Sequence, residues 1–265
     1  MGYDGVGIGA RDLGGGIELL KKAENLGLPL ISVNLYDTDG RRLFAPYRVV
    51  ERSGLNIGII AVTGLNPGVD GFLIREAESE LEAVLPDLET RSDMIVLLSS
   101  LPYKQTLTLV SRFEQIDIAV CADRSKGNLI PVHSGNALVL QTSSRGQYLG
   151  VLEATVRSGP WMMNKDNEAA KLKRQLQNIT MQLNHVQTLP PEAQAGRGES
   201  LNKQSSQLRE KIAEIEGGTV SDGQDHLSTY RSRYLPLSQS TRQDPRVQGI
   251  VNQFKKQIRA TDRTP

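Results

Sequence analysis

The chain has 265 residues, of which 38% are hydrophobic and 23% charged, a composition typical of a globular protein with one full domain and a further element. Aromatic residues make up 5%, too few for a surface that stacks single-stranded nucleic acid. Residues 1–156 carry 14 Lys and Arg against 19 Asp and Glu, whereas residues 157–265 carry 17 against 11. This basic excess is too dilute to bind a phosphate backbone, so we expect no nucleic acid partner.

Cysteine and histidine are sparse. The single Cys121 excludes an intrachain disulfide, a thiolate zinc site and covalent haem attachment, and its place at the end of an apolar run suits an inert core thiol. His133, His185 and His226 are isolated from one another, which favours structural or solvated roles. No stretch approaches the roughly 18 apolar residues of a membrane span, and no signal peptide precedes the folded pattern.

The first 156 residues alternate short apolar runs with amphipathic stretches, which predicts an α/β domain. Helices are expected at 17–26, closed by Gly27, at 75–89 and at 104–113. Strands are expected at 6–9, 28–35, 47–52, 55–62, 94–98, 118–121, 129–132, 137–141 and 148–156. Because Ser53-Gly54 separates 47–52 from 55–62, these two strands are predicted to form a hairpin.

Glycines near the N-terminus have the letters of a nucleotide-binding loop. Gly5-x-Gly7-x-x-Ala10 fits a dinucleotide fingerprint, and Gly14-Gly15-Gly16 precedes a predicted helix. Too little chain precedes Gly5 to form the strand that a dinucleotide-binding unit requires. We therefore interpret these residues as turn glycines.

Residues 165–216 follow a seven-residue apolar repeat with one gap, which predicts two coiled-coil helices. The repeat positions are Leu172, Leu176, Ile179, Leu183, Val186, Leu201, Leu208, Ile212 and Ile215. Leu189-Pro190-Pro191 breaks the repeat, so we expect an antiparallel helical hairpin. Nine apolar side chains contribute about 14–27 kcal/mol on burial, less than the entropy cost of ordering some fifty residues at roughly 1–2 kcal/mol each. We therefore expect the hairpin to pack on the main domain, on a second copy or on a protein partner.

The last segment, 217–265, is expected to be a linker and tail. Its glycines at 217, 218 and 223 predict a flexible joint, and an extended piece and a short amphipathic helix follow. The apolar stripe of this helix is Val247, Ile250, Val251, Phe254 and Ile258.

Several short segments of residues 2–156 are informative because of their order and spacing along the chain. They are Gly2-Tyr3-Asp4-Gly5-Val6-Gly7-Ile8-Gly9, Ile31-Ser32-Val33-Asn34-Leu35, Pro46-Tyr47, Asn56-Ile57-Gly58-Ile59-Ile60-Ala61-Val62-Thr63, Ile95-Val96-Leu97-Leu98-Ser99 and Gly146-Gln147-Tyr148-Leu149-Gly150. In order and approximate spacing they resemble the calcineurin-like metallophosphoesterase domain of bacterial periplasmic 5′-nucleotidases and UDP-sugar hydrolases. The resemblance implies an α/β fold, with a two-sheet sandwich flanked by helices over residues 1–156. It also implies an N-terminally incomplete domain, because the family's opening Asp-x-His and Gly-Asp motifs would lie before Met1.

The resemblance implies that the family's metal ligands are replaced. Its metal-binding Asn and catalytic His align with Ala10 and Arg11, and the acidic Asp12 remains. A ligand His aligns with Ser100, and the Gly-His-x-His motif aligns with Ala122-Asp123-Arg124-Ser125. Serine and alanine supply no imidazole nitrogen for a metal pair, so we expect no metal, no cofactor and no catalytic residues. Arg11, Asp12 and Asp123 remain as a candidate relic anion pocket.

Three functions are compatible with these residues. The first is a non-catalytic binding or assembly module in an extracytoplasmic complex. The second is a metal-dependent nucleotide or phosphomonoester hydrolase whose missing ligands come from an upstream segment or a partner subunit. The third is a metal-free anion-binding regulatory protein. The tail, Tyr234-Leu235-Pro236-Leu237 with Asp244-Pro245-Arg246-Val247 through Lys256, resembles a segment that follows this domain in nucleotidase-like chains which continue into multihaem cytochromes, and this implies a multihaem cytochrome partner. The family resemblance of residues 2–156 implies a periplasmic or other extracytoplasmic location.

Overall fold

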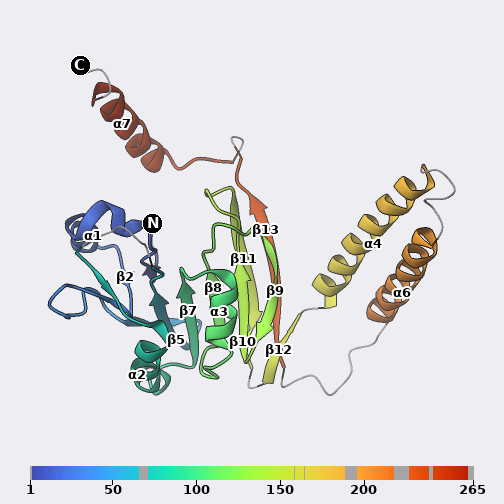
Figure 1. Cartoon of the computed structure of the whole chain (residues 1–265), viewed down its shortest axis with the longest axis horizontal. Helices are drawn as coiled ribbons and strands as arrows, with labels where there is room; N and C mark the ends of the chain where they lie inside the picture. The colour runs from blue at the N-terminus through green and yellow to red at the C-terminus, as the bar shows by residue number, and fades with distance from the viewer. Residues whose placement is uncertain are drawn as a thin grey trace.

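A computed structural model of the chain describes residues 2–65, 71–157, 159–163, 165–188, 196–217, 227–238 and 241–261. Its body is a mixed α/β fold in which helices, a six-stranded sheet and a three-stranded sheet form successive layers (Figure 1). Two long helices and a C-terminal helix extend away from this body (Figure 1). The predicted α/β sandwich of two sheets flanked by helices is therefore present.

The larger sheet is parallel at its centre and antiparallel at its edges. In spatial order its strands are β4 (Tyr47–Arg52), β5 (Leu55–Val62), β7 (Met94–Ser99), β8 (Ile118–Cys121), β10 (Ala137–Gln141) and β9 (Leu129–Ser134). In the predicted hairpin, Ser53 and Gly54 have φ of 54° and 79°, and a two-residue type I′ turn requires positive φ at both positions. Since the four central strands are parallel, their C-terminal ends meet at one edge of the sheet.

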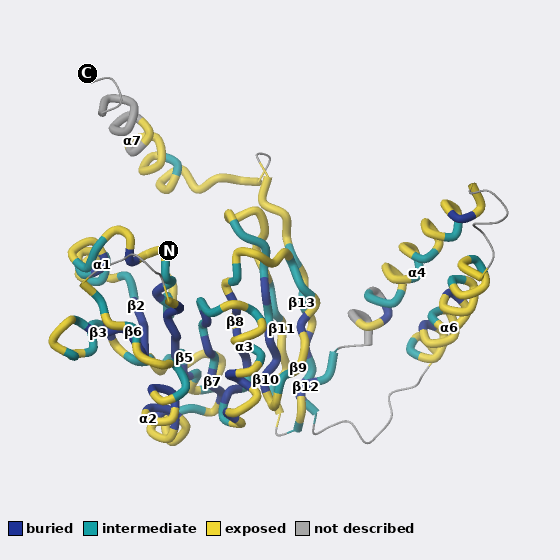
Figure 2. The backbone as a smooth tube through the Cα atoms, viewed as in Figure 1, coloured by how far each residue is buried: buried dark blue, intermediate teal, exposed yellow. Residues whose placement is uncertain are grey.

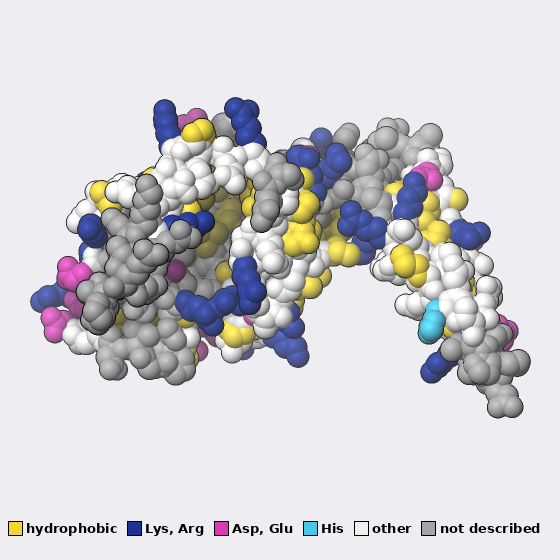
Figure 3. Space-filling view, turned by 90° about the horizontal axis from the view of Figure 1, so that it is seen from above, with side chains coloured by type: hydrophobic (Ala, Val, Ile, Leu, Met, Phe, Trp, Pro, Cys, Tyr) yellow, Lys and Arg dark blue, Asp and Glu magenta, His cyan; other side chains and the backbone are white. Residues whose placement is uncertain are grey.

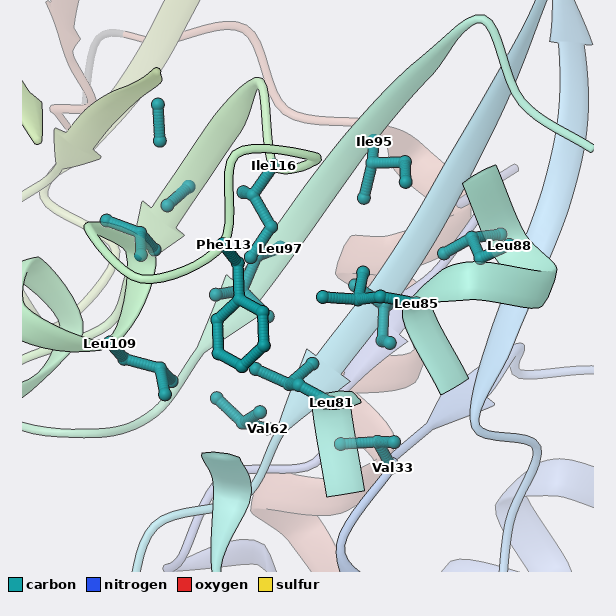
Figure 4. Close-up of a cluster of buried hydrophobic side chains, with 14 of the residues drawn as sticks. Val33, Val62, Leu81, Leu85, Leu88, Ile95, Leu97, Leu109, Phe113 and Ile116 are labelled. Atoms are coloured by element: carbon teal, nitrogen blue, oxygen red, sulfur yellow. The ribbon is translucent and has the colours of Figure 1, made fainter. Parts of the chain in front are cut away.

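Helices α2 (Ala77–Glu89) and α3 (Tyr103–Val110) cover one face of this sheet. Figure 4 shows their contact with the strands, in which Leu81 and Leu85 of α2 lie beside the ring of Phe113 and Leu97 of β7. These side chains are at most 7% exposed. Burial of this apolar cluster holds the loops at the strand ends in fixed positions.

The second sheet covers the other face. Its strands, in spatial order, are β11 (Tyr148–Thr155), β13 (Leu227–Pro236) and β12 (Gly159–Met163). Met94, Ile118 and Leu138 of the large sheet form a buried cluster with Trp161 and Tyr230 of the small one. The alternation of side chains along each central strand, with Ile95 and Leu97 toward the helices, sends the intervening residues to this second interface.

Strand β13 corrects the expected role of residues 217–265. We expected a linker and tail, but residues 227–236 form the central strand of the small sheet, paired with β11 on one side and β12 on the other. The sequence 227–236 mixes Ser, Thr and Arg with two tyrosines, so its apolar pattern is weak although Tyr230 is buried. Strands β12 and β13 are parallel neighbours, and residues 164–226, which include the two long helices, provide the crossover that parallel strands need.

The N-terminal strand packs against β5 and β7 of the large sheet. Strand β1 (Val6–Gly7) pairs with β2 (Leu30–Ile31), and the expected strand 28–35 is divided between β2 and β3 (Leu35–Tyr36), which pairs with β6 (Leu73–Ile74). The next elements are η1 (Asp12–Gly15) and α1 (Gly16–Asn25), and Gly27 follows α1 with φ of 87°.

Two of the glycines that we interpreted as turn residues, Gly5 and Gly7, have a different structural role. A Cβ on Gly5 would lie 2.9 Å from Ile31 Cδ1, and one on Gly7 would lie 3.1 Å from Leu98 Cβ. Neither has positive φ, so these glycines permit β1 to approach the sheet closely and do not serve a turn. This finding replaces the turn interpretation for Gly5 and Gly7.

The region 165–216 contains α4 (Lys165–Gln187) and α6 (Arg197–Gly217), which pack side by side (Figure 1). Of the nine repeat residues, Val186 and Ile212 are buried and the other seven are half-buried. Ser205 is buried at the gap of the repeat, and Ala169 extends the α4 stripe by one position. The facing stripes are therefore partly open to solvent, as the teal segments of Figure 2 show.

The C-terminal helix α7 (Pro245–Thr261) follows β13 and stands apart from the body (Figures 1 and 2). Within the described ranges, no helix is both long and apolar enough to cross a membrane.

Candidate functional site

A cavity of about 1040 Å³ opens where the central parallel strands end. It is lined by the loops that follow β1, β5, β7 and β8, together with the first residues of α2 and α3. Viewed onto this end, the molecule is hollowed and Lys and Arg side chains stand around the hollow (Figure 3). Arg11, Asp12 and Asp123, the predicted relic anion residues, all line this cavity, as does Ser100.

The carboxylate of Asp12 is engaged with its own loop. Its Oδ2 accepts a hydrogen bond of 2.8 Å from the backbone N–H of Gly9. This bond closes the loop between β1 and η1, and the neighbouring Arg11 is exposed. Asp12 therefore has one oxygen committed to backbone geometry.

Both oxygens of Asp123 accept backbone hydrogen bonds. Oδ2 accepts from the N–H of Tyr103, at the start of α3, at 2.9 Å, and Oδ1 accepts from the N–H of Ser125 at 2.8 Å. The bond from Tyr103 is the largest reason why the pKa of Asp123 lies below its ordinary value, because it stabilises the charged form. Asp123 thus caps α3 from the loop after β8.

Gln141, at the end of β10, fixes the loop that follows β8. Its side chain is 1% exposed; the N–H of Asp123 donates to Gln141 Oε1 at 3.1 Å, and Gln141 Nε2 donates to the carbonyl of Asp123 at 3.0 Å. A buried amide with both ends satisfied holds a loop rigidly. The position of the Asp123 carboxylate is therefore set by the core.

Ser100 joins two loops of the cavity wall. Its Oγ accepts from the N–H of Gly64 at 2.7 Å and donates to the carbonyl of Val62 at 3.3 Å. A Cβ on Gly64 would lie 2.8 Å from the backbone oxygen of Ser100, so the two loops are in close contact. The hydroxyl at this position serves the backbone.

The floor of the cavity contains a buried polar network that was not identified from the sequence. Asn34 Nδ2 donates to the carbonyls of Thr63 and Arg75 at 3.0 Å each, and the N–H of Thr63 donates to Asn34 Oδ1 at 2.8 Å. The Thr63 hydroxyl donates to the carbonyl of Ile8 at 2.9 Å and lies 2.7 Å from Ser32 Oγ. Two polar residues inside the otherwise apolar run 30–36 were the available signal.

Cations of the cavity fall into two groups. Arg112 pairs with Glu78, and Arg75 lies 3.5 Å from Glu80 Oε1. By contrast, Arg11, Lys104 and Arg124 form no ion pair with any residue that the structure describes. Three cationic side chains at the cavity wall are thus available to an anion.

Glu80 anchors the base of α2 beside the cavity. It accepts from Arg42 Nη2 at 2.8 Å and from the Tyr36 hydroxyl at 2.5 Å. Burial raises the pKa of Glu80, but these bonds and the two arginines outweigh it, so the pKa lies below its ordinary value. This side chain is a structural anion.

The donor set does not fit a two-metal centre. In the described part of the chain, no three His, Cys, Asp or Glu side chains gather where they could hold a metal ion. His133 lies on β9, with its ring 6.2 Å from that of Tyr230, and His185 lies on α4, whereas His226 is outside the described residues. At the positions that align with the family's metal ligands, the cavity presents Ala10, Arg11, Ser100, Ala122 and the backbone-bonded carboxylates of Asp12 and Asp123, a set that does not hold a metal pair.

Comparisons with known proteins relate this fold to nucleotidases. No protein-family model matches the chain. The 5′-nucleotidase of Vibrio cholerae serotype O1 is 28% identical over 116 residues, which are 40% of this chain and 21% of that protein. The 5′-nucleotidase of Vibrio parahaemolyticus is 32% identical over 65 residues, which are 24% of this chain and 12% of that protein. The chain therefore spans about a fifth or less of these relatives.

Solved structures show the same fold. A putative 5′-nucleotidase from Staphylococcus aureus, in complex with α-ketoglutarate, has a TM-score of 0.51 and 17% identity, covering 58% of this chain and 35% of that one. The sulfate thiohydrolase SoxB from Thermus thermophilus, in complex with glycerol, has a TM-score of 0.52 and 20% identity, covering 58% and 30%. The resemblance to 5′-nucleotidase metallophosphoesterases is confirmed, and the chain contains a 5′-nucleotidase-like domain.

Proposed function

We propose that this 5′-nucleotidase-like domain is non-catalytic and serves as a binding or assembly module. The observation that carries the proposal is the state of the polar groups at the strand ends. Asp123 is bonded to two backbone N–H groups, Asp12 to another, and the Ser100 hydroxyl to a fourth. Side chains engaged in this way hold loops together, and those at the neighbouring aligned positions, Ala10 and Arg11, do not bind cations.

The test is metal content and hydrolysis by the purified chain. We expect substoichiometric manganese and zinc by elemental analysis after incubation with either ion, and no phosphate release from nucleoside monophosphates. The control variant is Asp39→Ala, an exposed carboxylate outside the cavity lining. Stoichiometric metal with phosphate release that is abolished by chelator and by Asp12→Ala, but not by Asp39→Ala, would overturn the proposal in favour of a metal-dependent hydrolase.

We assign partner binding to the surface of the α4–α6 hairpin. Seven of its nine repeat residues are half-buried even though the two helices already pack together, so the apolar stripes have area left to bury. The helices also share the ion pair between Lys173 Nζ and Glu216 Oε1 at 2.5 Å, which closes one end of the pair. We assign this surface to a protein partner or a second copy of the chain, in a periplasmic or other extracytoplasmic complex that includes a multihaem cytochrome.

A second candidate function is metal-free anion binding in the cavity. It is supported by Arg11, Lys104 and Arg124, which line the cavity and have no ion pair with a described residue. Because Asp12 and Asp123 are satisfied by backbone N–H groups, their charge is already partly compensated. A phosphate or carboxylate group bound by these cations would make the domain a sensor.

A further inference from the structure

Helix α7 carries an apolar stripe that faces solvent. Val247, Ile250 and Val251 are 37%, 68% and 38% exposed, and they occupy positions i, i+3 and i+4 of a 17-residue helix. At 1.5 Å per residue, the helix is about 25 Å long. The predicted stripe continues through the sequence positions of Phe254 and Ile258.

This helix is organised independently of the body. Pro245 occupies its first position, and the side chain of Asp244 accepts from the N–H of Arg246 at 2.8 Å and of Val247 at 3.3 Å. Its other described side-chain bond, from Gln248 Nε2 to Asn252 Oδ1 at 2.9 Å, stays within the helix. In Figures 1 and 2 the helix stands clear of both sheets, so none of the layers covers the stripe.

The charges of α7 have one sign. Residues 245–261 contain Arg246, Lys255, Lys256 and Arg259 and no Asp or Glu. With 100° between successive residues, Arg246 and Lys255 lie on opposite flanks of the stripe centred on Val247 and Val251. An apolar stripe bordered on both sides by basic residues is the pattern of a helix that lies in a membrane interface.

We propose that α7 lies on the surface of a bilayer that contains anionic lipid, with Val247, Ile250 and Val251 inserted below the headgroups. Charge complementarity favours lipid as the occupant. An anionic surface meets Arg246 on one flank of the stripe and Lys255 on the other, and residues 245–261 contain no acidic residue with which to select a particular partner charge. This inference does not depend on the role of the cavity or the hairpin, and it describes a helix that lies on a membrane and does not span it.

The experiment is sedimentation of the whole chain with vesicles. Vesicles of phosphatidylglycerol and phosphatidylcholine in equal parts are compared with vesicles of phosphatidylcholine alone, in low and high salt. We expect binding to the anionic vesicles, weakened by salt because the ionic attraction is screened. The change Arg246→Gln removes one charge near the surface and is expected to weaken binding about fivefold.

Two matched variants test the stripe. Ile250→Asp places a charge on the apolar side, and Asn252→Asp places the same charge on the opposite side while keeping its Oδ1 acceptor. We expect Ile250→Asp to lose at least about tenfold in vesicle affinity and Asn252→Asp to lose much less, with equal helical content by circular dichroism. Equal binding to both vesicle types, equal loss in the two variants, or no vesicle binding at all would overturn the proposal, and the last result would assign the stripe to a protein groove.

Discussion

Asn34 and Thr63 are bonded reciprocally across the floor of the cavity: the N–H of Thr63 donates to Asn34 Oδ1 at 2.8 Å, and Asn34 Nδ2 donates back to the carbonyl of Thr63 at 3.0 Å. Both side chains are 1% exposed. The pair satisfies the backbone just after β5, where the chain leaves the sheet and has no ladder partner. A buried backbone group needs a hydrogen-bond partner, and the side-chain amide of Asn34 provides the bonds that a neighbouring strand would otherwise make.

Asn34→Leu is therefore expected to lower the free energy of unfolding by about 3 kcal/mol, because it leaves the N–H and carbonyl of Thr63 buried without these bonds and also removes the part-buried bond to the carbonyl of Arg75. Urea denaturation of the two proteins measures the difference. Asn25→Leu, at the exposed end of α1, is the matched control and should change stability by less than about 0.5 kcal/mol. Equal effects would show that the network contributes nothing particular.

Close contact between two loops gives a second prediction. Gly64→Ala is expected to destabilise the fold by about 1–3 kcal/mol, since its Cβ would lie 2.8 Å from the backbone oxygen of Ser100 and backbone yields little. Gly14→Ala is the control, because a Cβ there has nothing within 4 Å and its φ is not positive. Thermal unfolding of both variants is the measurement. We expect a lowered midpoint for Gly64→Ala alone, and equal midpoints for the two variants would contradict the close contact.

Asp123 makes the stability depend on pH. Because its pKa is lower in the folded chain than in the unfolded chain, its contribution is fully present above the ordinary Asp pKa near 3.9 and is lost as pH falls toward the folded value. Asp123→Ala should cost about 1–2 kcal/mol at pH 7, through the lost cap on α3, and less at pH 3. Denaturation at the two pH values tests this, with Asp39→Ala as the exposed control. A cost that does not change with pH would exclude the carboxylate as its source.

Much of this architecture was predictable because the core follows simple periodicities. The run 94–98 is wholly apolar, as expected of a parallel strand buried on both faces, and the Ser53-Gly54 turn identified the hairpin of 47–52 with 55–62. An extended piece was expected in the region of β13, but its place in the sheet was not predictable, because its pairing with β11 depends on residues about eighty positions away and its own pattern is mixed. Local patterns do not report such distant pairing.

The cavity was predictable in part. Arg11, Asp12 and Asp123 were placed together by the resemblance, and they do line one cavity. The roles of Gln141, Asn34 and Lys104 were not visible, since each depends on which backbone group or cavity lies beside it in space. Neither spacing nor composition distinguishes Gln141 and Lys104 from surface residues, whereas the signal for Asn34 was its place inside the apolar run 30–36.

The hairpin gives a prediction about assembly. Residues 165–216 can be replaced by a Gly-Ser linker of about a dozen residues, long enough for the crossover between parallel β12 and β13. We expect the body to keep its thermal midpoint and the chain to lose its oligomeric state or its partner, measured by light scattering and by pull-down from a periplasmic extract. An unchanged oligomeric state and unchanged partners would remove the hairpin from the interface.

Anion binding in the cavity gives the last prediction. In the presence of chelator, inorganic phosphate at 100 times its dissociation constant should stabilise the chain by about 2.7 kcal/mol, because only the folded state presents Arg11, Lys104 and Arg124 together. For a chain of this size, that corresponds to a rise in thermal midpoint of roughly 5–10 °C. Arg11→Gln should remove most of the rise and leave the midpoint without phosphate unchanged, since Arg11 is exposed and forms no ion pair with a described residue. The control for a general effect of charge is Lys126→Gln. Lys126 is exposed and close in sequence to Arg124 but outside the cavity lining, so this variant should retain the full rise. Equal rises in the two variants would mean that phosphate acts on the surface at large, and the absence of a rise in the unmodified chain would eliminate the anion-sensing function while leaving the assembly role intact.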